Sequence, residues 1–348
     1  MKMHKQKFIL LFFGIINLSS CTKLLYTSLD VLRPAKVEFN TEANNLSIIN
    51  NTVIQPQNVG HKTILLDGKT QNISVLTDSL AIFCLTSMTE ELESKGFFQT
   101  VKLKPNTINN SKEFSKPEKL SNENVVKICN LNNTNVVLSL DRIKVSDDLK
   151  EYYLAENSTY LNSLEVKFET NWSIHYLNNS DVKTVNFKDT LYWETESYSR
   201  MKASSELPSR EDALIDGALE IGRKSVNRFI PYWEKVDRYF FSSENKMIKR
   251  GLDSIYVKNW DSAIDLWKSV FQITKSSMIQ AKAANNIAVA YEITGDINNA
   301  IDYATKALYS YSKLTIIDYQ TFIRLSEYLN ELNKRKNEIR ILKKQLGD

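Results

Sequence analysis

Residues 166–176 alternate between a mainly apolar set of side chains and a polar set, and this pattern constrains the fold more than any other segment. One set contains Val166, Phe168, Thr170, Trp172, Ile174 and Tyr176; the other contains Lys167, Glu169, Asn171, Ser173 and His175. A period of two predicts a strand with one face on a core and the other in water. A polar turn at 178–181 and a second apolar series, Val185, Phe187, Leu191 and Trp193, predict a return strand. We therefore expect a long β-hairpin.

The N-terminus is typical of an export signal. Residues 1–7 carry three lysines, and residues 8–16 form an apolar run that is shorter than the roughly 20 residues of a membrane span. The following Leu18-Ser19-Ser20-Cys21 resembles the bacterial lipobox, in which the cysteine is acylated and becomes the mature N-terminus. Because Thr22 rather than Asp follows, the resemblance implies an outer-membrane protein that faces the periplasm, with the lipid on Cys21.

Charge and composition narrow the function classes. Residues 1–20 contain three Lys and no acidic residue, so their removal lowers the formal charge from +4 to +1, which gives no reason to expect a nucleic-acid partner. Only 3 His and 3 Cys are present, and one of each lies near the N-terminus, so we expect no metal site and no cofactor. Cys84 and Cys129 either pair or remain buried thiols, and the sequence leaves both alternatives open.

The body of the chain is expected to be α+β. Strands at 35–39, 46–49, 97–103 and 136–145 alternate with helices that begin near Asp78, Ser121 and Ser209 and pack apolar faces inward. The expected organisation is a signal peptide at 1–20, a tether at 21–33, an α/β sandwich-like domain at 34–239 and an all-α tetratricopeptide-like domain at 240–348 with a final capping helix.

Residues 284–308 resemble a tetratricopeptide repeat, and a weaker copy precedes them. The positions that carry the repeat core are Gly251, Trp260, Ala263 and Trp267 in the first copy, and Ala288, Tyr291, Gly295, Ala300 and Ala307 in the second. Ala284 and Ala304 depart from the pattern, which has larger side chains there. We expect Trp267 and Tyr291 to pack between helices.

Together, the lipobox, Leu32-Arg33-Pro34-Ala35, the strand at 172–176, Pro231-Tyr232-Trp233 and the paired helices resemble an uncharacterised family of bacterial outer-membrane lipoproteins with tetratricopeptide tails. This family brings no established activity. The order of elements in the first half is also similar to that of periplasmic α/β domains in secretion and envelope-assembly lipoproteins, which is an analogy of fold alone.

Catalytic motifs do not stand out. Residues 217–225 approach the P-loop pattern, but an extra Arg223 precedes the lysine and no strand comes before, so Gly217 and Gly222 are expected to be packing glycines inside a helix. His175 falls on the polar face of its strand, where we expect a surface residue and not a catalytic one. The sequence assigns no catalytic residue.

The leading hypothesis is a non-enzymatic scaffold that binds a partner protein through its helical repeats. Asn285 and Glu292 are expected on the concave face, where the amide would bond the backbone of an extended peptide and the carboxylate a basic side chain; ordinary polar surface is the alternative for this pair. A hydrolase of envelope polymer with unidentified carboxylates, and a nutrient-capture lipoprotein, are the competing functions.

Overall fold

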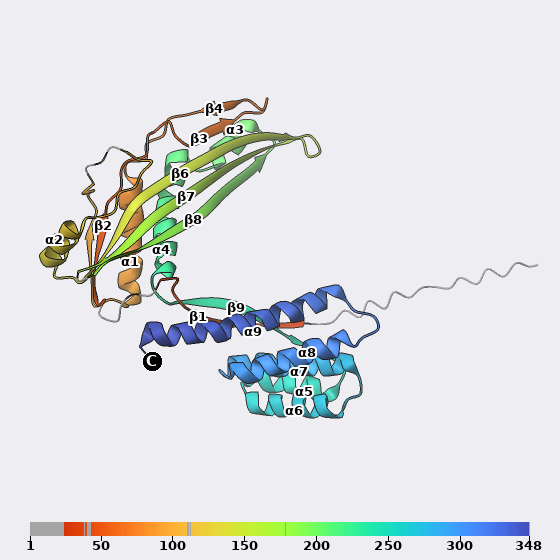
Figure 1. Ribbon diagram of the computed structural model, residues 1–348. Helices are drawn as coiled ribbons and strands as arrows, with labels where there is room; N and C mark the ends of the chain where they lie inside the picture. Colours follow the sequence, from red (N-terminus) through yellow and green to blue (C-terminus); the bar gives the residue numbers. More distant parts are fainter. Residues whose placement is uncertain are drawn as a thin grey trace, which may run out of the picture. The chain divides into compact units, whose positions relative to one another are not determined.

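The structure is a computed structural model (Figure 1). It describes residues 24–37, 39, 43–109, 111, 113–177 and 179–347. The predicted signal peptide and Cys21 lie outside these residues. The chain divides into two compact units: unit 1 contains residues up to Val31 together with Glu234–Arg340, and unit 2 contains Leu32–Trp233 together with Ile341–Asp348. Most of unit 2 is thus an insertion within the sequence of unit 1.

Unit 2 contains the sheet and the helices that cover it. Its elements are β2 (Asn45–Asn50), β3 (His61–Ile64), β4 (Thr70–Asn72), α1 (Leu80–Lys95), β5 (Thr100–Lys104), α2 (Asn122–Asn132), β6 (Val136–Leu154), β7 (Thr159–Tyr176), β8 (Asn179–Ser197), α3 (Arg200–Glu206), α4 (Arg210–Ser225) and the short 3-10 helix η1 (Val226–Arg228). Strands and covering helices here, followed by an all-helical region, confirm the predicted α+β class.

The sheet of unit 2 is mixed, and β6 is its central strand. One edge of β6 pairs in parallel with β2 near its start and with β3 further along, while the other edge pairs antiparallel with β7. β5 adds in parallel to β2, β4 adds antiparallel to β3, and β8 adds antiparallel to β7. The predicted hairpin is therefore the β7–β8 pair, and both strands are longer than the sequence pattern indicated.

A bulge in β6 changes which residues face the core. The register with β7 shifts between Leu140 and Arg142, so Asp141 is the extra residue of a β-bulge. Before the bulge Leu138 and Leu140 point into the core, and after it Ile143 and Val145 do so. The bulge thus lets one long strand keep its apolar residues on the same face although their positions change from even to odd numbers.

Helices α1 and α4 lie together on the core face of the sheet (Figure 1). A Cβ atom on Gly222 of α4 would lie 2.1 Å from the carbonyl oxygen of Cys84 on α1, so the helices approach more closely there than any other residue allows. A Cβ on Gly217 would lie 2.3 Å from the ring of Phe168. Both glycines lie inside α4, as the sequence predicted when it excluded a P-loop.

Unit 1 consists of five helices and the larger parts of two strands among the described residues. Its elements are β1 (Leu24–Arg33), β9 (Tyr232–Phe241), α5 (Lys246–Tyr256), α6 (Trp260–Ile273), α7 (Ser277–Ile293), α8 (Ile297–Ser312) and α9 (Tyr319–Leu346), whose last residues belong to unit 2. Side chains of Asn245, Asn259, Ser276 and Asp296 cap the starts of α5 to α8. Among the described residues, no helix has the length and apolar character needed to cross a membrane.

Several elements differ from the prediction. The segment predicted as a tether, residues 21–33, contains β1, which pairs with β9 in a two-stranded sheet. The described part of 35–39 is not a strand, and the strand β9 lies across the boundary predicted at residue 240. The first and the last of these differences have one reason: β1 and β9 are far apart in the sequence, and a strand's partner is not visible in its local pattern.

Candidate functional site

In unit 1, side chains of α7 hold the backbone of β9. The Asn285 amide donates to the carbonyl oxygen of Tyr239 at 3.0 Å. The Asn286 side chain bonds Phe241 twice, accepting from its backbone N–H at 2.7 Å and donating to its carbonyl oxygen at 2.9 Å. An asparagine amide has both a donor and an acceptor, so it can pair with a backbone as another strand would.

A buried ion pair continues the same contact. Arg238 of β9 donates from Nε and Nη2 to the two carboxylate oxygens of Glu292 on α7, at 2.7 and 2.8 Å. The Tyr328 hydroxyl of α9 donates to the same carboxylate at 3.0 Å. Burial, followed by the Glu292 charge, raises the pKa of Tyr328, which keeps this hydroxyl protonated as a donor.

These contacts correct the prediction for Asn285 and Glu292. Both side chains bind an extended segment in the way expected, the amide to a backbone carbonyl and the carboxylate to a basic side chain. However, the segment is β9 of the same chain, and both residues are buried, Asn285 to 0% exposure. The expectation of an open face at these two residues is wrong, because β9 covers them.

The residues predicted for the repeat core lie inside or at the edge of unit 1. Trp267 is fully buried and its Nε1 donates to the carbonyl oxygen of Ile248, while Gly251 leaves the space that its indole occupies. Tyr291 is half-buried and stacks on Tyr303 with ring centroids 5.9 Å apart. Of the remaining residues, four are buried and one, Trp260, is half-buried; the buried ones are Ala263, Ala288, Ala300 and Ala307. Gly295 has a left-handed backbone conformation. The tetratricopeptide assignment itself stays a prediction.

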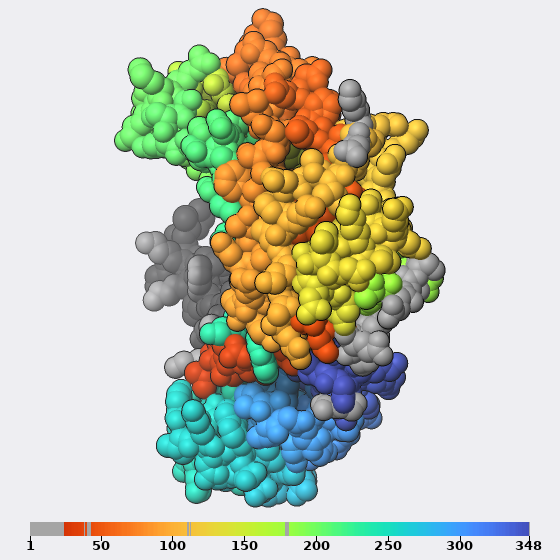
Figure 2. All heavy atoms as spheres, turned by 90° about the vertical axis from the view of Figure 1, so that its left-hand side faces the viewer, coloured from red at the N-terminus to blue at the C-terminus, as the bar shows by residue number. Residues whose placement is uncertain are grey.

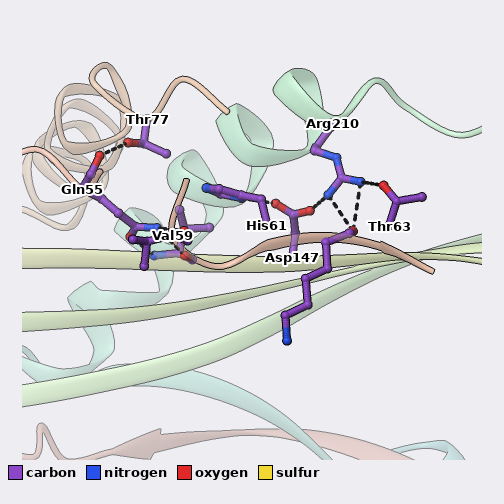
Figure 3. A network of polar contacts seen from close by, with 9 residues as sticks. Gln55, Val59, His61, Thr63, Thr77, Asp147 and Arg210 are labelled. Carbon is purple, nitrogen blue, oxygen red and sulfur yellow. Dashed lines mark hydrogen bonds and ion pairs between the residues drawn. The ribbon is translucent and has the colours of Figure 1, made fainter. Parts of the chain in front are cut away.

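In unit 2, a buried ionic network joins three elements around Asp147 (Figure 3). Asp147 of β6 contacts Nδ1 of His61 at the start of β3 and the guanidinium of Arg210 at the start of α4. Arg210 also donates to the carbonyl oxygen of Lys62 at 3.1 Å and to the Thr63 hydroxyl at 2.9 Å. Burial, and then the Arg210 charge, lower the pKa of His61, so the imidazole is neutral where its Nδ1 contacts the Asp147 carboxyl group.

Gln55 closes the gap between β2 and β3 beside this network (Figure 3). Its amide accepts from the backbone N–H of Val145 at 2.9 Å and donates to the carbonyl oxygen of the same residue at 2.8 Å. A second bond runs from Gln55 to the carbonyl oxygen of Val59 at 2.7 Å. The side chain thus replaces a strand residue opposite Val145, and the edge of β6 stays paired between β2 and β3.

A second buried polar cluster surrounds Asp141 on the other face of the sheet. Its carboxylate accepts from the hydroxyls of Ser139 at 2.7 Å and Ser173 at 2.5 Å, and from the Asn51 amide at 2.9 Å. Burial raises the pKa of Asp141, although these hydrogen bonds oppose the rise. Nε2 of His175 lies 3.2 Å from Oγ of Ser139.

The cluster is covered by the segment that connects β5 to α2. Asn51 donates to the carbonyl oxygen of Glu118, and Leu120 packs with Ile49 and α2. Figure 2 shows atoms of this segment, in orange to yellow, on the surface of unit 2. The prediction that His175 is a surface residue is therefore wrong: it is 2% exposed, because a later loop covers this end of the polar face.

The Asp141 cluster brings Ser, His and Asp together without the geometry of a catalytic triad. In a triad the serine hydroxyl donates to the histidine, whose second nitrogen donates to the aspartate. Here Ser139 donates to Asp141 directly, and Nδ1 of His175 has no hydrogen-bond partner among the described residues. Burial, and then the charge of Lys119, lower the pKa of His175 to about 4, so the imidazole is neutral. The arrangement orders neighbouring strands and gives the serine no base.

Asp147, Arg210 and Asp141 were not singled out from the sequence. The sequence could have revealed Asp147, because it lies two residues after Val145 and four after Ile143 in the same strand and therefore faces the core with them. A carboxylate among the core-facing residues of a strand needs a buried partner. In the described part of the chain, no three His, Cys, Asp or Glu residues gather as a metal site would require, and Cys84 and Cys129 are both buried free thiols.

The long strand β8 forms an edge of the sheet. It pairs with β7 from Tyr160 opposite Ser197 to Tyr176 opposite Asn179, and no strand among the described residues pairs with its other side. Lys183 and Lys188 are exposed in its first half, and Glu194 and Glu196 near its end. Backbone N–H and C=O groups on a free edge are available to an added strand.

Fold and contacts together define an α+β protein in which a mixed-sheet unit interrupts a helical unit that holds its own strand. Residues 43–241 match the model of a family described as a domain of unknown function (DUF8603), so the chain belongs to that family. Residues 249–334 match a second model, also described as a domain of unknown function (DUF6340). A search of curated proteins gives no significant match.

Proposed function

We propose that this protein is an outer-membrane lipoprotein, facing the periplasm, that binds other envelope proteins and catalyses no reaction. The lipobox-like Leu18-Ser19-Ser20-Cys21 after an apolar run supports the anchor. The surface we assign to partner binding is the free edge of β8 rather than the helical face expected from the sequence, because β9 occupies Asn285 and Glu292.

The observation that carries the binding function is the length of this edge. β8 has 19 residues, whereas most strands in globular proteins have 3–10. Proteins usually shorten, cover or bend an edge strand, because a long open edge recruits further strands. Strand addition to such an edge is a recurrent mode of peptide recognition, in which main-chain hydrogen bonds give the affinity.

The charges along β8 describe the partner strand. The even-numbered residues of β8 form its exposed face, and on this face Lys188 precedes Glu194 and Glu196, so the charge changes sign along the face. Side chains directly opposite each other on paired strands stabilise the pair when their charges are opposite. The partner is thus an extended segment with an acidic residue opposite Lys188 and basic residues opposite the two glutamates.

Hydrogen exchange on a purified complex tests this mode of binding. The partner is first identified in intact cells with photo-crosslinking residues placed at Asn186 and Thr190 of β8. The control position is Tyr256, which is exposed on unit 1. In the complex of wild-type protein with that partner, alternate amides of β8 should gain protection, because an added strand bonds every second residue. Amides of β7, which is paired on both sides, should not change. A stable complex without protection in β8 would exclude strand addition.

The anchor has a separate test. Cells given radiolabelled fatty acid should label the wild-type protein and not the Cys21→Ser variant, because the thiol is the site of acylation. The lipoprotein modification supplies several acyl chains, enough for firm attachment, whereas one chain anchors only marginally. Equal labelling of the two proteins would refute the anchor and leave the β8 proposal to be decided by hydrogen exchange.

The hydrolase remains the second candidate because Ser139, Asp141 and His175 meet in one cluster. It is less favoured, because all three side chains are buried and the hydroxyl hydrogen of Ser139 is directed to Asp141. A nutrient-capture role has no specific contact in its support. Turnover of envelope polymer by the purified protein that is lost in Ser139→Ala would reverse this order.

A further inference from the structure

One end of unit 1 carries exposed apolar side chains around two helix connections. They are Ile273, Tyr309, Ile316, Ile317 and Tyr319, which we call the anchor-end surface. Ile316 is the most exposed large apolar residue of the described chain, at 87%. Lys275 and Lys313 are exposed in the same two connections. Apolar residues that gather at one exposed place usually mark a surface that meets something other than water.

The direction of the helices places these residues at one end. Consecutive helices from α5 to α8 pack on one another and are joined by three-residue connections, so they run antiparallel. The connections after α6 and α8 therefore lie at the same end, and the connections after α5 and α7 lie at the opposite end. Val257, between α5 and α6, is 76% exposed and belongs to the opposite end.

The first described residue lies at the anchor end as well. Leu24 and Leu314 pack against the same hydrophobic cluster, which contains Phe241 and Tyr311. Leu314 belongs to the connection between α8 and α9, and Tyr311 to the last turn of α8. In Figure 1 the start of β1 and the connection after α8 lie toward the same end of unit 1.

The distance along the chain then limits how far this end can be from an acylated Cys21. Leu24 lies three positions after Cys21, with only two residues between them. A fully extended chain advances about 3.3–3.6 Å per residue, so the two positions are at most about 10 Å apart. An anchor this short brings the surface around Leu24 to the headgroup layer of the membrane that holds the lipid.

We infer that the anchor-end surface contacts the bilayer itself. This inference rests on the acylation of Cys21 in the proposed function. Tyrosine is enriched where membrane meets water, because its ring is apolar and its hydroxyl is polar. Moving the isoleucine side chains of this surface out of water lowers the free energy, and the lysines beside them attract anionic headgroups. The acyl chains and this surface together fix the orientation of unit 1 on the membrane.

Site-specific quenching in vesicles tests the contact. The acylated protein carries an environment-sensitive dye on a cysteine introduced as Ile316→Cys. It is reconstituted into vesicles of phosphatidylethanolamine and phosphatidylglycerol that contain a lipid-borne quencher. Cys84 and Cys129 are buried and their pKa values are raised by burial, so they do not compete for the dye. The matched control is Val257→Cys, which is equally apolar and exposed at the opposite end.

The dye at position 316 should be quenched several-fold more than the dye at position 257. A second variant, Ile317→Asp with the dye at 316, should lower that quenching because it places a charge in the contact. Equal quenching of the dyes at 316 and 257 would overturn the membrane contact. The contact would also be overturned if the dye at 316 became shielded from water only when periplasmic proteins were added to the vesicles. The intact mass of the same samples separates the two proposals: unacylated protein refutes the anchor, whereas acylated protein with equal quenching refutes only the contact.

Discussion

Arg238 and Glu292 face each other across two hydrogen bonds inside unit 1, from Nε to Oε2 at 2.7 Å and from Nη2 to Oε1 at 2.8 Å. Two parallel bonds of this kind fix both the distance and the orientation of the two groups. Because Arg238 lies on β9 and Glu292 on α7, the pair determines where β9 sits on the helices. Its neighbours Asn285 and Asn286 then bond the β9 backbone.

Replacing Glu292 with Gln should lower the free energy of unfolding of the protein by about 3–5 kcal/mol, because Arg238 would remain buried without a counter-charge. Urea unfolding of the variant and the wild type measures the difference. The control is Asp302→Asn, which removes an exposed pair with Lys306 and should cost less than about 1 kcal/mol. Equal effects of the two changes would show that the Arg238–Glu292 pair is not buried in solution.

Trp267 and Tyr291 should differ in their contribution to stability although the sequence predicts the same role for both. Trp267→Ala should cost about 3–5 kcal/mol, because the indole is fully buried and leaves a cavity. Tyr291→Ala should cost about 1–2 kcal/mol, because the half-buried ring loses its stacking on Tyr303 but leaves little empty space. Thermal melts of both variants compare the losses, and a Tyr291 effect as large as that of Trp267 would contradict the structure.

Gly222 should not tolerate a methyl group. A Cβ there would lie 2.1 Å from a backbone oxygen of α1, so Gly222→Ala must push α1 and α4 apart, at a cost of about 1–3 kcal/mol. Asp216→Ala on the exposed face of α4 is the matched control and should change stability by less than about 0.5 kcal/mol. Chemical denaturation measures both. A stabilising Gly222→Ala, as helix propensity alone would give, would contradict the close approach.

His175 should make the protein less stable in mild acid. Its pKa is about 4 in the folded state and 6.5 as the ordinary value, so between these pH values the unfolded chain binds the proton and the folded one does not. From pH 6.5 to pH 5 this loss amounts to about 1.5 kcal/mol for the single group. His175→Gln keeps a side-chain donor but cannot titrate, so its unfolding free energy should fall less over the same range. Parallel pH profiles for wild type and variant would contradict a buried neutral imidazole.

Local patterns predicted the elements that depend on nearby residues. The period of two gave the β7–β8 pair, and Ser121 and Ser209 cap α2 and α4 as expected from their sequence context. The strands β3 and β4 have four and three residues, too few to show a period. β1 was read as a tether because its partner β9 is about 200 residues away, and no local pattern specifies such pairing.

The buried clusters show a different limit of sequence reasoning. His175 was placed on a wet face by alternation alone, which is correct for an isolated strand and wrong once the segment near Glu118 covers it. Asn285 and Glu292 were given suitable binding chemistry, but the sequence could not reveal that β9 already uses it. In each case the residue's type was informative, and its surroundings depended on a distant segment.

The pairing of β1 with β9 also sets the order in which parts of the chain can fold during synthesis. Ser28 and Asp237 bond across 209 positions of sequence, and the whole of Leu32–Trp233 emerges between them. Residues 32–233 contain the core of unit 2 and can fold as soon as they have been synthesised, whereas β1 must wait unpaired until β9 has been made. Contacts that close so long a loop form slowly. For that interval β1 is a strand without its partner, and its backbone groups are open to pairing with other chains.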